Sequence, residues 1–253
     1  MALNAPDWLV ARPIAHRGLH DLSAGFVENT LAAANAALDA GFAIECDLQL
    51  SADGEVFVFH DDVLDRLTEK SGRLIEKSAA EIRAVHLAAA PETIPAFSDL
   101  LALVAGGTPI VCELKSRFDG DWRIGERAVV IADDYAGPLA FKSFDPDLIA
   151  YIRLRFPHLR RPLGVVAEAS YEAADWDFLS DDQRRACQTF NHRGRSAPDF
   201  LSWRVGDLPH GTPFFEKELH GLPIMTWTVK SDADRSAARK WADQIIFEGE
   251  GRP

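Results

Sequence analysis

Four short polar clusters interrupt otherwise apolar, strand-like runs of this 253-residue chain. They are His16-Arg17-Gly18, Glu45-Cys46-Asp47, His60-Asp61-Asp62 and Glu113-Leu114-Lys115. Charged side chains are rarely buried without a partner, because desolvating a lone ion costs several kcal/mol. We therefore interpret the four clusters as parts of one site that holds an ion or a charged substrate.

The acidic members of these clusters predict a metal site. Glu45, Asp47 and Glu113 can supply oxygen ligands to a hard divalent cation, Mg²⁺ or Ca²⁺, whereas zinc prefers histidine and cysteine. Cys46 and Cys112 alternate out of phase with these carboxylates. We expect both cysteines to face the helical layer as packing residues.

The basic members predict acid–base chemistry on a phosphate. His16 and His60 can exchange protons near neutral pH, and Arg17 and Lys115 are suited to bind phosphate oxygens. Together with a divalent cation they indicate phosphoryl transfer. No Walker loop is present, so a phosphoester is favoured over a nucleoside triphosphate as substrate. We interpret five other histidines as core or surface residues with satisfied hydrogen bonds: His86, His158, His192, His210 and His220.

The elements that must position these residues alternate along the chain. Strands are predicted at Pro13–His16, Ala43–Leu50, Glu55–His60, Pro109–Lys115, Leu139–Ser143, Pro162–Val166, Cys187–Asn191, Phe200–Val205, Pro223–Val229 and Gln244–Phe247. Helices are predicted at Asn29–Ala40, at Asp99–Ala105 after a Ser98 cap, at Asp147–Phe156 after Asp145-Pro146, and at Asp232–Trp241 after a Ser231 cap. The alternation favours a mostly parallel sheet, either a closed barrel or an open doubly wound sheet. The absence of a Gly-x-Gly-x-x-Gly loop favours the barrel, whose sites lie at the carboxyl ends of strands.

One connection is too short for a parallel crossover. Leu50 and Val56 are separated by a segment that contains Asp53-Gly54, a strong hairpin signal. We expect an antiparallel pair in which Glu45 lies opposite His60, with Asp47 on the same face. Residues 61–96 then form a small insertion, and residues 1–253 a single domain.

Composition excludes several classes of partner. The chain is 47% hydrophobic and 26% charged, with 27 basic and 39 acidic residues and a formal charge of −12. Such a chain lacks the basic surface that nucleic acids or anionic membranes require. No apolar run is long enough for stable membrane insertion, no signal peptide is evident, and there are only three cysteines. We expect a cytoplasmic protein with reduced thiols; its oligomeric state is not predicted.

A series of motifs extends over nearly the whole chain. It comprises AHRG (15–18), ENT (28–30), IECDLQLSADG (44–54), FHDDVLDRLT (59–68), IPAF (94–97), CELK (112–115), SFDP (143–146) and TWTV (226–229). In order and spacing this series resembles the glycerophosphodiester phosphodiesterase family. The resemblance implies a slightly irregular TIM-type (β/α)8 barrel of the phospholipase-C-like type, with a small insertion after the His60 strand.

The resemblance also implies an activity, namely metal-dependent hydrolysis of glycerophosphodiesters to sn-glycerol 3-phosphate and an alcohol. It assigns His16 and His60 as acid and base, and Glu45, Asp47 and Glu113 as ligands of Mg²⁺ or Ca²⁺. Substrate or phosphate contacts fall on Arg17, Lys115, Glu28, Asn29 and Trp227. Glu28 and Asn29 are equally compatible with the start of a helix, with Asn29 near its cap, and Trp227 with a barrel core. Attack by a glycerol hydroxyl, through a cyclic phosphate, and direct attack by water both remain open.

Three positions depart from the family pattern: Lys142, Lys230 and Glu248. Two further functions stay open beside the diesterase. A lysophospholipase-D-like activity would need an apolar acceptor, for which Phe214, Phe215 and Leu219 are candidates, but core packing is the favoured interpretation of these residues. A non-catalytic barrel that binds a phosphorylated ligand should have lost a histidine or a carboxylate, and this chain keeps them all. A metal-dependent lyase or aldolase is a weaker alternative, because it does not account for the two histidines and Arg17.

Overall fold

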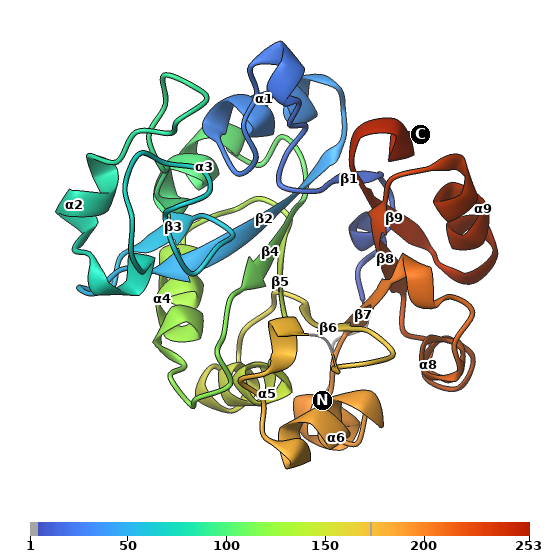
Figure 1. Ribbon diagram of the computed structural model, residues 1–253. Coiled ribbons are helices and arrows are strands. Elements are labelled where there is room, and N and C mark those ends of the chain that lie inside the picture. The colour runs from blue at the N-terminus through green and yellow to red at the C-terminus, as the bar shows by residue number, and fades with distance from the viewer. Residues whose placement is uncertain (1–4, 173) are drawn as a thin grey trace. The chain divides into compact units, whose positions relative to one another are not determined.

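A computed structural model describes residues 5–172 and 174–253 of the chain. Residues 1–4, the start of the stretch in which no signal peptide is expected, lie outside the described part. The chain divides into two compact units. Figure 1 labels their helices and strands. We call Ile14–Lys115 with Arg123–Leu139 the N-terminal unit, and residues 5–13, Ser116–Trp122 and Ala140–Pro253 the C-terminal unit. Among the described residues, no helix has both the length and the apolar character needed to cross a membrane.

The N-terminal unit is built around one long strand. Its elements are β1 (Ile14–Ala15), η2 (Leu22–Ala24), α1 (Leu31–Asp39), β2 (Ala43–Leu50), β3 (Val56–Val58), η3 (Leu74–Glu76), α2 (Ala79–Arg83), α3 (Phe97–Val104), β4 (Ile110–Leu114) and α4 (Arg123–Ile131). Strand β2 pairs in parallel with β1 and β4, and antiparallel with β3. The predicted change of direction at Asp53-Gly54 is therefore confirmed.

The predicted register of this hairpin is wrong by one residue. Leu48 pairs with Val58 and Leu50 with Val56, so the pairing is centred on Asp53. The reason is the loop from Ser51 to Glu55, which the Ser51 N–H closes by donating to the Glu55 carbonyl at 2.9 Å. Strand β3 ends at Val58. Residue 60 lies beyond the strand, so the alternation of strand side chains does not set the direction of the His60 side chain.

The segment at 61–96 has its own apolar core. Leu64, Leu74, Ile82 and Ile94 are buried together with Phe57 of β3 and other apolar residues. The backbone of the segment is joined by isolated bridges, among them Val63 with Arg73 and Thr68 with Leu87. Packing, rather than regular secondary structure, fixes this segment in place.

The C-terminal unit continues the alternation of strands and helices. Its elements are η1 (Asp7–Leu9), β5 (Leu139–Ser143, whose first residue belongs to the N-terminal unit), α5 (Pro146–Arg155), β6 (Leu163–Ala167), η4 (Ala174–Trp176), α6 (Asp181–Gln188), α7 (Arg193–Ser196), β7 (Phe200–Arg204), η5 (Val205–Asp207), α8 (Gly211–His220), β8 (Ile224–Val229), α9 (Asp232–Trp241), β9 (Gln244–Phe247) and η6 (Gly249–Gly251). Strands β5 to β9 pair in parallel in chain order. Their burial is nearly continuous from β5 to β8, as parallel strands covered on both faces require.

Two local predictions are corrected. Cys187–Asn191 is not a strand but the end of α6 and the turn after it. Ser180 and Gln183 form a capping box that starts this helix, and the Asn191 N–H donates back to the Ala186 carbonyl. Helix α3 begins two residues before its predicted start. Its N-cap is Ala96, whose N–H donates to the Asp99 carboxylate at 3.0 Å, so Ser98 does not cap it.

Two predicted helix starts are confirmed. Asp145 caps α5 by accepting hydrogen bonds from the backbone N–H groups of residues 147 and 148, and Pro146 occupies the first turn. Ser231 caps α9 by accepting from the Asp234 N–H. In both cases the signal is a polar side chain followed by helix formers. Such a cap depends only on residues two or three positions away, so it can be predicted from the sequence.

Candidate active site

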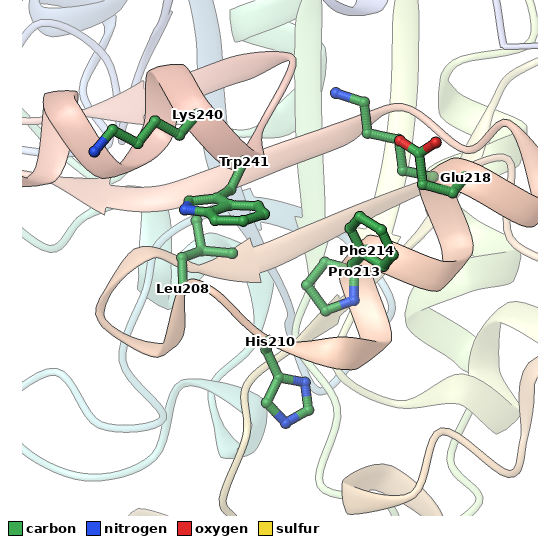
Figure 2. Close-up of a pocket in the computed structure, with 8 residues that line it drawn as sticks. Leu208, His210, Pro213, Phe214, Glu218, Lys240 and Trp241 are labelled. Atoms are coloured by element: carbon green, nitrogen blue, oxygen red, sulfur yellow. The ribbon is translucent and has the colours of Figure 1, made fainter.

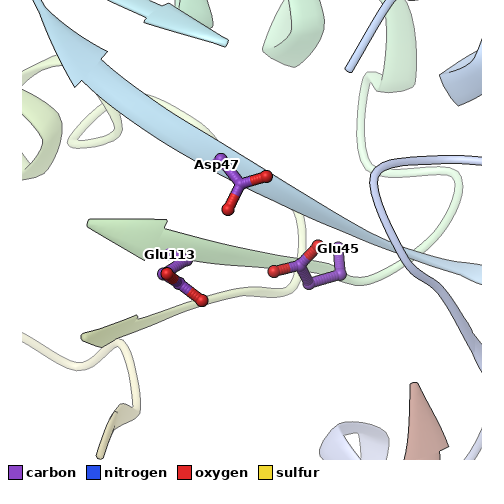
Figure 3. Close-up of side chains that lie close together, drawn as sticks. All are labelled: Glu45, Asp47 and Glu113. Carbon is purple, nitrogen blue, oxygen red and sulfur yellow. The ribbon is translucent and has the colours of Figure 1, made fainter. Parts of the chain in front are cut away.

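Three carboxylates of the N-terminal unit converge (Figure 3). Glu45 and Asp47 lie two residues apart on β2 and so share a face, and Asp47 pairs in register with Glu113 of β4. Each residue offers one oxygen that lies within 4.8 Å of the others, and all three residues are buried. Two oxygens on one cation at ~2.3–2.6 Å lie at most about 5 Å apart. The three carboxylates therefore fit a single hard divalent ion.

Two cationic side chains neutralise part of this acidic cluster. The Lys115 Nζ donates to Asp47 Oδ1 at 2.8 Å and to Glu113 Oε1 at 2.5 Å. Arg17 donates its backbone N–H to Glu45 Oε2 at 3.1 Å, and its Nε lies 3.3 Å from Asp47 Oδ2. Burial by itself would raise the pKa of Asp47, but the charges of Lys115, His60 and Arg17 prevail and hold that pKa well below its usual range. Asp47 is consequently ionised and ready to bind a cation.

Asn29 fixes the orientation of Asp47. Its Nδ2 donates to Asp47 Oδ2 at 2.8 Å, and its Oδ1 accepts from the Asp47 N–H at 3.2 Å. Asn29 itself has a positive φ of 58°, which asparagine tolerates better than most residues. The cap of α1 is Thr30, whose hydroxyl accepts from the Ala33 N–H. Asn29 therefore precedes the helix, and its side chain bonds to the acidic cluster.

Gly18 allows the His16-Arg17 segment to approach helix α1. A Cβ on Gly18 would lie 2.8 Å from the backbone carbon of Ala33, and the φ of Gly18 is 77°. The adjacent Arg17 also has a positive φ, at 56°. Only glycine satisfies both the contact and the backbone conformation at position 18. This turn directs Arg17 back onto the carboxylates of β2.

The two histidines differ in burial and in the carboxylate that each one contacts. The His16 Nε2 lies 3.8 Å from Glu45 Oε2, in a buried setting. His60 is more exposed, and its Nδ1 lies 2.7 Å from Asp61 Oδ1. Because an ionised carboxylate only accepts, His60 donates from Nδ1, and in the neutral ring the acceptor nitrogen is then Nε2. Despite the corrected register, the charge of His60 acts on Asp47.

Glu28 and Arg66 extend the network, and sequence reasoning gave Arg66 no role. Glu28 Oε1 accepts from Arg17 Nη1 at 2.7 Å and from Arg66 Nη2 at 2.7 Å. Arg66 also donates to both oxygens of Asp61, the carboxylate that binds His60. The signal available in the sequence was its position inside the FHDDVLDRLT motif, six residues after His60.

The cysteines take the predicted place. Cys46 and Cys112 are register partners on β2 and β4, on the face opposite to the carboxylates. Both are buried and free, and their sulfur atoms lie 3.7 Å apart. The pKa of Cys46 is raised well above its usual value by its contact with Cys112 and by burial. Such thiols are poor nucleophiles, which agrees with a packing role.

The C-terminal unit contains a cluster of aromatic side chains around Trp227. Trp227 of β8 is half-buried, donates from Nε1 to the Ser202 carbonyl at 3.0 Å, and packs edge-on against Phe144. Phe144 in turn packs against Trp176, whose Nε1 donates to Glu168 at 2.5 Å. Trp227 is thus anchored by a hydrogen bond and an aromatic neighbour within its own unit, and its predicted substrate contact stays a prediction.

The three departures from the family pattern have distinct environments. Lys142 is fully buried in β5, where its register partner on β6 is Gly164. Lys230 and Glu248 form an ion pair, with 2.7 Å between Nζ and Oε2. Two of the three departing residues therefore bind one another.

A hollow of the C-terminal unit lies around α8 and the end of α9 (Figure 2). Its volume is about 110 Å³, and it is lined by Leu208, His210, Pro213, Phe214, Lys217, Glu218, Lys240 and Trp241. The lining carries no cluster for chemistry: His210 stacks on Trp203 and caps α8, and Lys217 pairs with Asp243. Phe214, Phe215 and Leu219 are 47%, 56% and 69% exposed. Core packing, one of their two predicted roles, is wrong.

Solved structures resemble this chain along almost its entire length. A phosphodiesterase from Oleispira antarctica, solved with the product sn-glycerol-3-phosphate, superposes with a TM-score of 0.74 at 20% identity, over 95% of this chain and 93% of its own. A glycerophosphodiester phosphodiesterase from Thermotoga maritima gives 0.69 at 22% identity, over 92% of each chain. These likenesses show the fold: the protein has the TIM-type (β/α)8 architecture predicted from its sequence.

The family follows from the sequence match. Residues 16–249 match the glycerophosphoryl diester phosphodiesterase family, and the chain therefore belongs to it. A glycerophosphodiester phosphodiesterase from Caldanaerobacter subterraneus is 29% identical over 157 residues, which are 58% of this chain and 63% of that protein. Glycerophosphodiester phosphodiesterase 1 of Bos taurus is 44% identical over 78 residues, 30% of this chain, and the match spans only 22% of the bovine protein.

Proposed function

We propose that this protein hydrolyses glycerophosphodiesters to sn-glycerol 3-phosphate and an alcohol with the help of a divalent cation. The observation that carries the proposal is the convergence of Glu45, Asp47 and Glu113 beside two cationic side chains in a member of this family. The solved relative that holds sn-glycerol-3-phosphate supports the choice of substrate class. The substrate is a small molecule, and no nucleic acid is involved.

The cation would be held by the three carboxylates, and it would supply polarisation of a phosphoryl oxygen. The charges in the site support this assignment. Three carboxylates with Lys115 and Arg17 leave one net negative formal charge, which would repel a phosphodiester. A divalent cation changes that balance to one net positive charge. Separate addition of Mg²⁺ and Ca²⁺ to the stripped protein distinguishes the two cations.

His16 and His60 are the proposed acid and base. One removes the proton from the attacking hydroxyl or water, and the other gives a proton to the departing alcohol. The bond from His60 Nδ1 to Asp61 presents Nε2 for proton exchange. Arg17 and Lys115 are proposed to bind phosphate oxygens once the cation shares the carboxylates. Trp227 is proposed as an apolar contact for the substrate, and Glu28 and Asn29 hold Arg17 and Asp47 in place.

The decisive experiment measures release of glycerol 3-phosphate from a panel of glycerophosphodiesters that differ in the alcohol. The protein is stripped with a chelator and then supplied with Mg²⁺ or Ca²⁺ separately. We expect no release after stripping and recovery with at least one cation. Lysophospholipids serve as the comparison substrates: preference for them would establish the lysophospholipase-D-like alternative. Binding of a phosphorylated ligand without any release under either cation would establish the non-catalytic alternative.

Cytoplasmic residence belongs to the same proposal. All three cysteines, Cys46, Cys112 and Cys187, are free and buried, as is usual where thiols are kept reduced. Fractionation of the cells that make the protein, followed by detection with an antibody, tests this point.

A further inference from the structure

One arginine of the 61–96 segment uses its whole guanidinium group to bind two carboxylates. Arg66 donates from Nε to Asp61 Oδ2 at 2.6 Å and from Nη2 to Asp61 Oδ1 at 3.0 Å. It also donates from Nη1 and Nη2 to the two oxygens of Glu28, at 2.9 and 2.7 Å. Asp61 lies five residues from Arg66 in the sequence and Glu28 lies 38 residues from it, and Arg66 binds both. Paired, planar contacts of this kind are the property that distinguishes arginine from lysine.

Each of the two carboxylates has a second basic partner in the site. Asp61 binds the His60 ring at Nδ1, at 2.7 Å, and Glu28 binds Arg17 Nη1, also at 2.7 Å. A continuous chain of bonds therefore runs from His60 through Asp61, Arg66 and Glu28 to Arg17. The Asp61 and Glu28 side chains are only 19% and 13% exposed, so little solvent is available to replace a lost partner.

The backbone that carries Arg66 is held firmly. Thr68 donates its N–H and its hydroxyl to the Leu64 carbonyl, at 3.1 and 2.9 Å. Leu64 is fully buried in the core of the 61–96 segment, and Leu67 packs against that core. Arg66 thus projects from a turn whose two ends are fixed. The segment has a clear structural consequence, which is to place one guanidinium group between two carboxylates of the site.

We propose that Arg66 is a positioning residue, which holds Asp61 and Glu28 so that the His60 ring and the Arg17 guanidinium keep a fixed orientation together. The inference rests on the proposed function, because it deepens the account of the same site. Without Arg66, Asp61 and Glu28 would each keep one partner but could swing with it. Misplacement of a catalytic group by about 1 Å can cost ~10²-fold in rate.

The test compares Arg66→Ala and Arg66→Lys with a matched control, Arg73→Ala. Arg73 belongs to the same segment and is similarly exposed, but its carboxylate contacts, to Asp62 and Glu76, are 3.8 Å long. We expect kcat for glycerol 3-phosphate release to fall about 10²-fold in Arg66→Ala and less in Arg66→Lys. Guanidinium added to Arg66→Ala should restore part of the rate, and Arg73→Ala should stay within about twofold of wild type. Equal kcat values for Arg66→Ala and Arg73→Ala would overturn the proposal.

A second readout does not depend on turnover. In ¹⁵N-labelled protein, the ring nitrogens of His60, assigned with a His60→Gln variant, should show one neutral tautomer with the proton on Nδ1. We expect Arg66→Ala to mix the two tautomers, and Arg73→Ala to leave the ring signals unchanged. Ring signals that stay unchanged in Arg66→Ala would overturn the inference, even if activity falls. Were wild-type protein inactive on every diester, the proposed function would fail, and the ring signals would still decide the role of Arg66.

Discussion

The two units of the molecule use the same strand–helix alternation for different side-chain chemistry. In the N-terminal unit, strands β2 and β4 place Glu45, Asp47 and Glu113 on one face, where Lys115 binds two of them. The strands of the C-terminal unit instead carry a half-buried Trp227, which packs on Phe144, and a fully buried Lys142. The site that fits a cation is therefore contained within one unit.

The fold and the reaction make separate demands on a strand. The alternation of β5 to β8 satisfies the fold with buried, mostly apolar residues. The carboxylates of β2 and β4 oppose folding, because three like charges are buried together, and are tolerated only with cationic partners. The candidate site is therefore found where buried strands carry charged side chains in place of apolar ones.

The largest effect on cation binding and activity is expected from Glu113→Gln. Replacement by glutamine removes one charge and one cation ligand with almost no change in volume. We expect loss of measurable Mg²⁺ or Ca²⁺ binding by calorimetry and a fall of ~10⁴-fold in activity, since a bound cation contributes several kcal/mol. The matched control is Glu168→Gln, a buried carboxylate of the other unit, which should leave cation affinity unchanged. Equal cation affinities in the two variants would refute the three-carboxylate site.

The histidines provide the next largest effect. We expect His16→Ala and His60→Ala each to lower kcat by ~10³-fold while cation binding is retained, since general acid–base catalysis contributes 10²–10⁴-fold. His86→Ala is the control, because His86 is an exposed histidine of the same unit. Steady-state kinetics with a saturating cation gives the measurement. Full activity in either of the first two variants would rule out the proposed acid–base pair.

In the C-terminal unit a buried histidine should affect stability instead of catalysis. Burial, followed by the charge of Arg195, lowers the pKa of His192 to about 4 from the usual 6.5. The neutral form is therefore favoured on folding, and stability that is complete above pH 6.5 is lost as the pH falls toward 4. Between pH 7.5 and 5 we expect a loss of about 2 kcal/mol from this residue.

The measurement is urea unfolding of wild type, His192→Gln and His158→Gln at the two pH values. Only His192→Gln should have a smaller pH dependence, because His158 is exposed. An unaltered pH dependence in His192→Gln would show that its burial does not control its protonation. Activity at pH 7.5 should be the same in all three proteins, which sharpens the contrast between the units.

The smallest effect is expected at Trp227. Replacement by alanine removes an aromatic contact of about 0.5–1.5 kcal/mol, and we expect KM to rise a few-fold with kcat nearly unchanged. Trp241→Ala, at the hollow of Figure 2, is the control for removal of a partly exposed indole. If the two variants have the same KM, the substrate contact of Trp227 is refuted, and its role is confined to packing against Phe144.

Much of the candidate site could be predicted because its signals are local. The two-residue spacing of Glu45 and Asp47 places both on one face of any strand, and helix caps such as Asp145 and Ser231 depend on adjacent residues. Predictions from local patterns were wrong where a loop hydrogen bond or a competing helix cap set the structure. The predicted hairpin register was wrong by one residue because the loop after Leu50 closes on Ser51 and Glu55. The predicted strand at Cys187–Asn191 competed with a capping box seven residues earlier.

The family, the alternation of strands and helices, and the residue types that can bind a cation and exchange protons all follow from the amino-acid sequence. Tertiary structure alone decided which of those residues meet. Asn29 binds Asp47, Arg66 binds Glu28, and Lys230 binds Glu248, in each case across 18 or more residues of the chain. The physical reason is that periodicity and capping act over a few residues, whereas such contacts depend on how packed segments such as 61–96 fix their backbones.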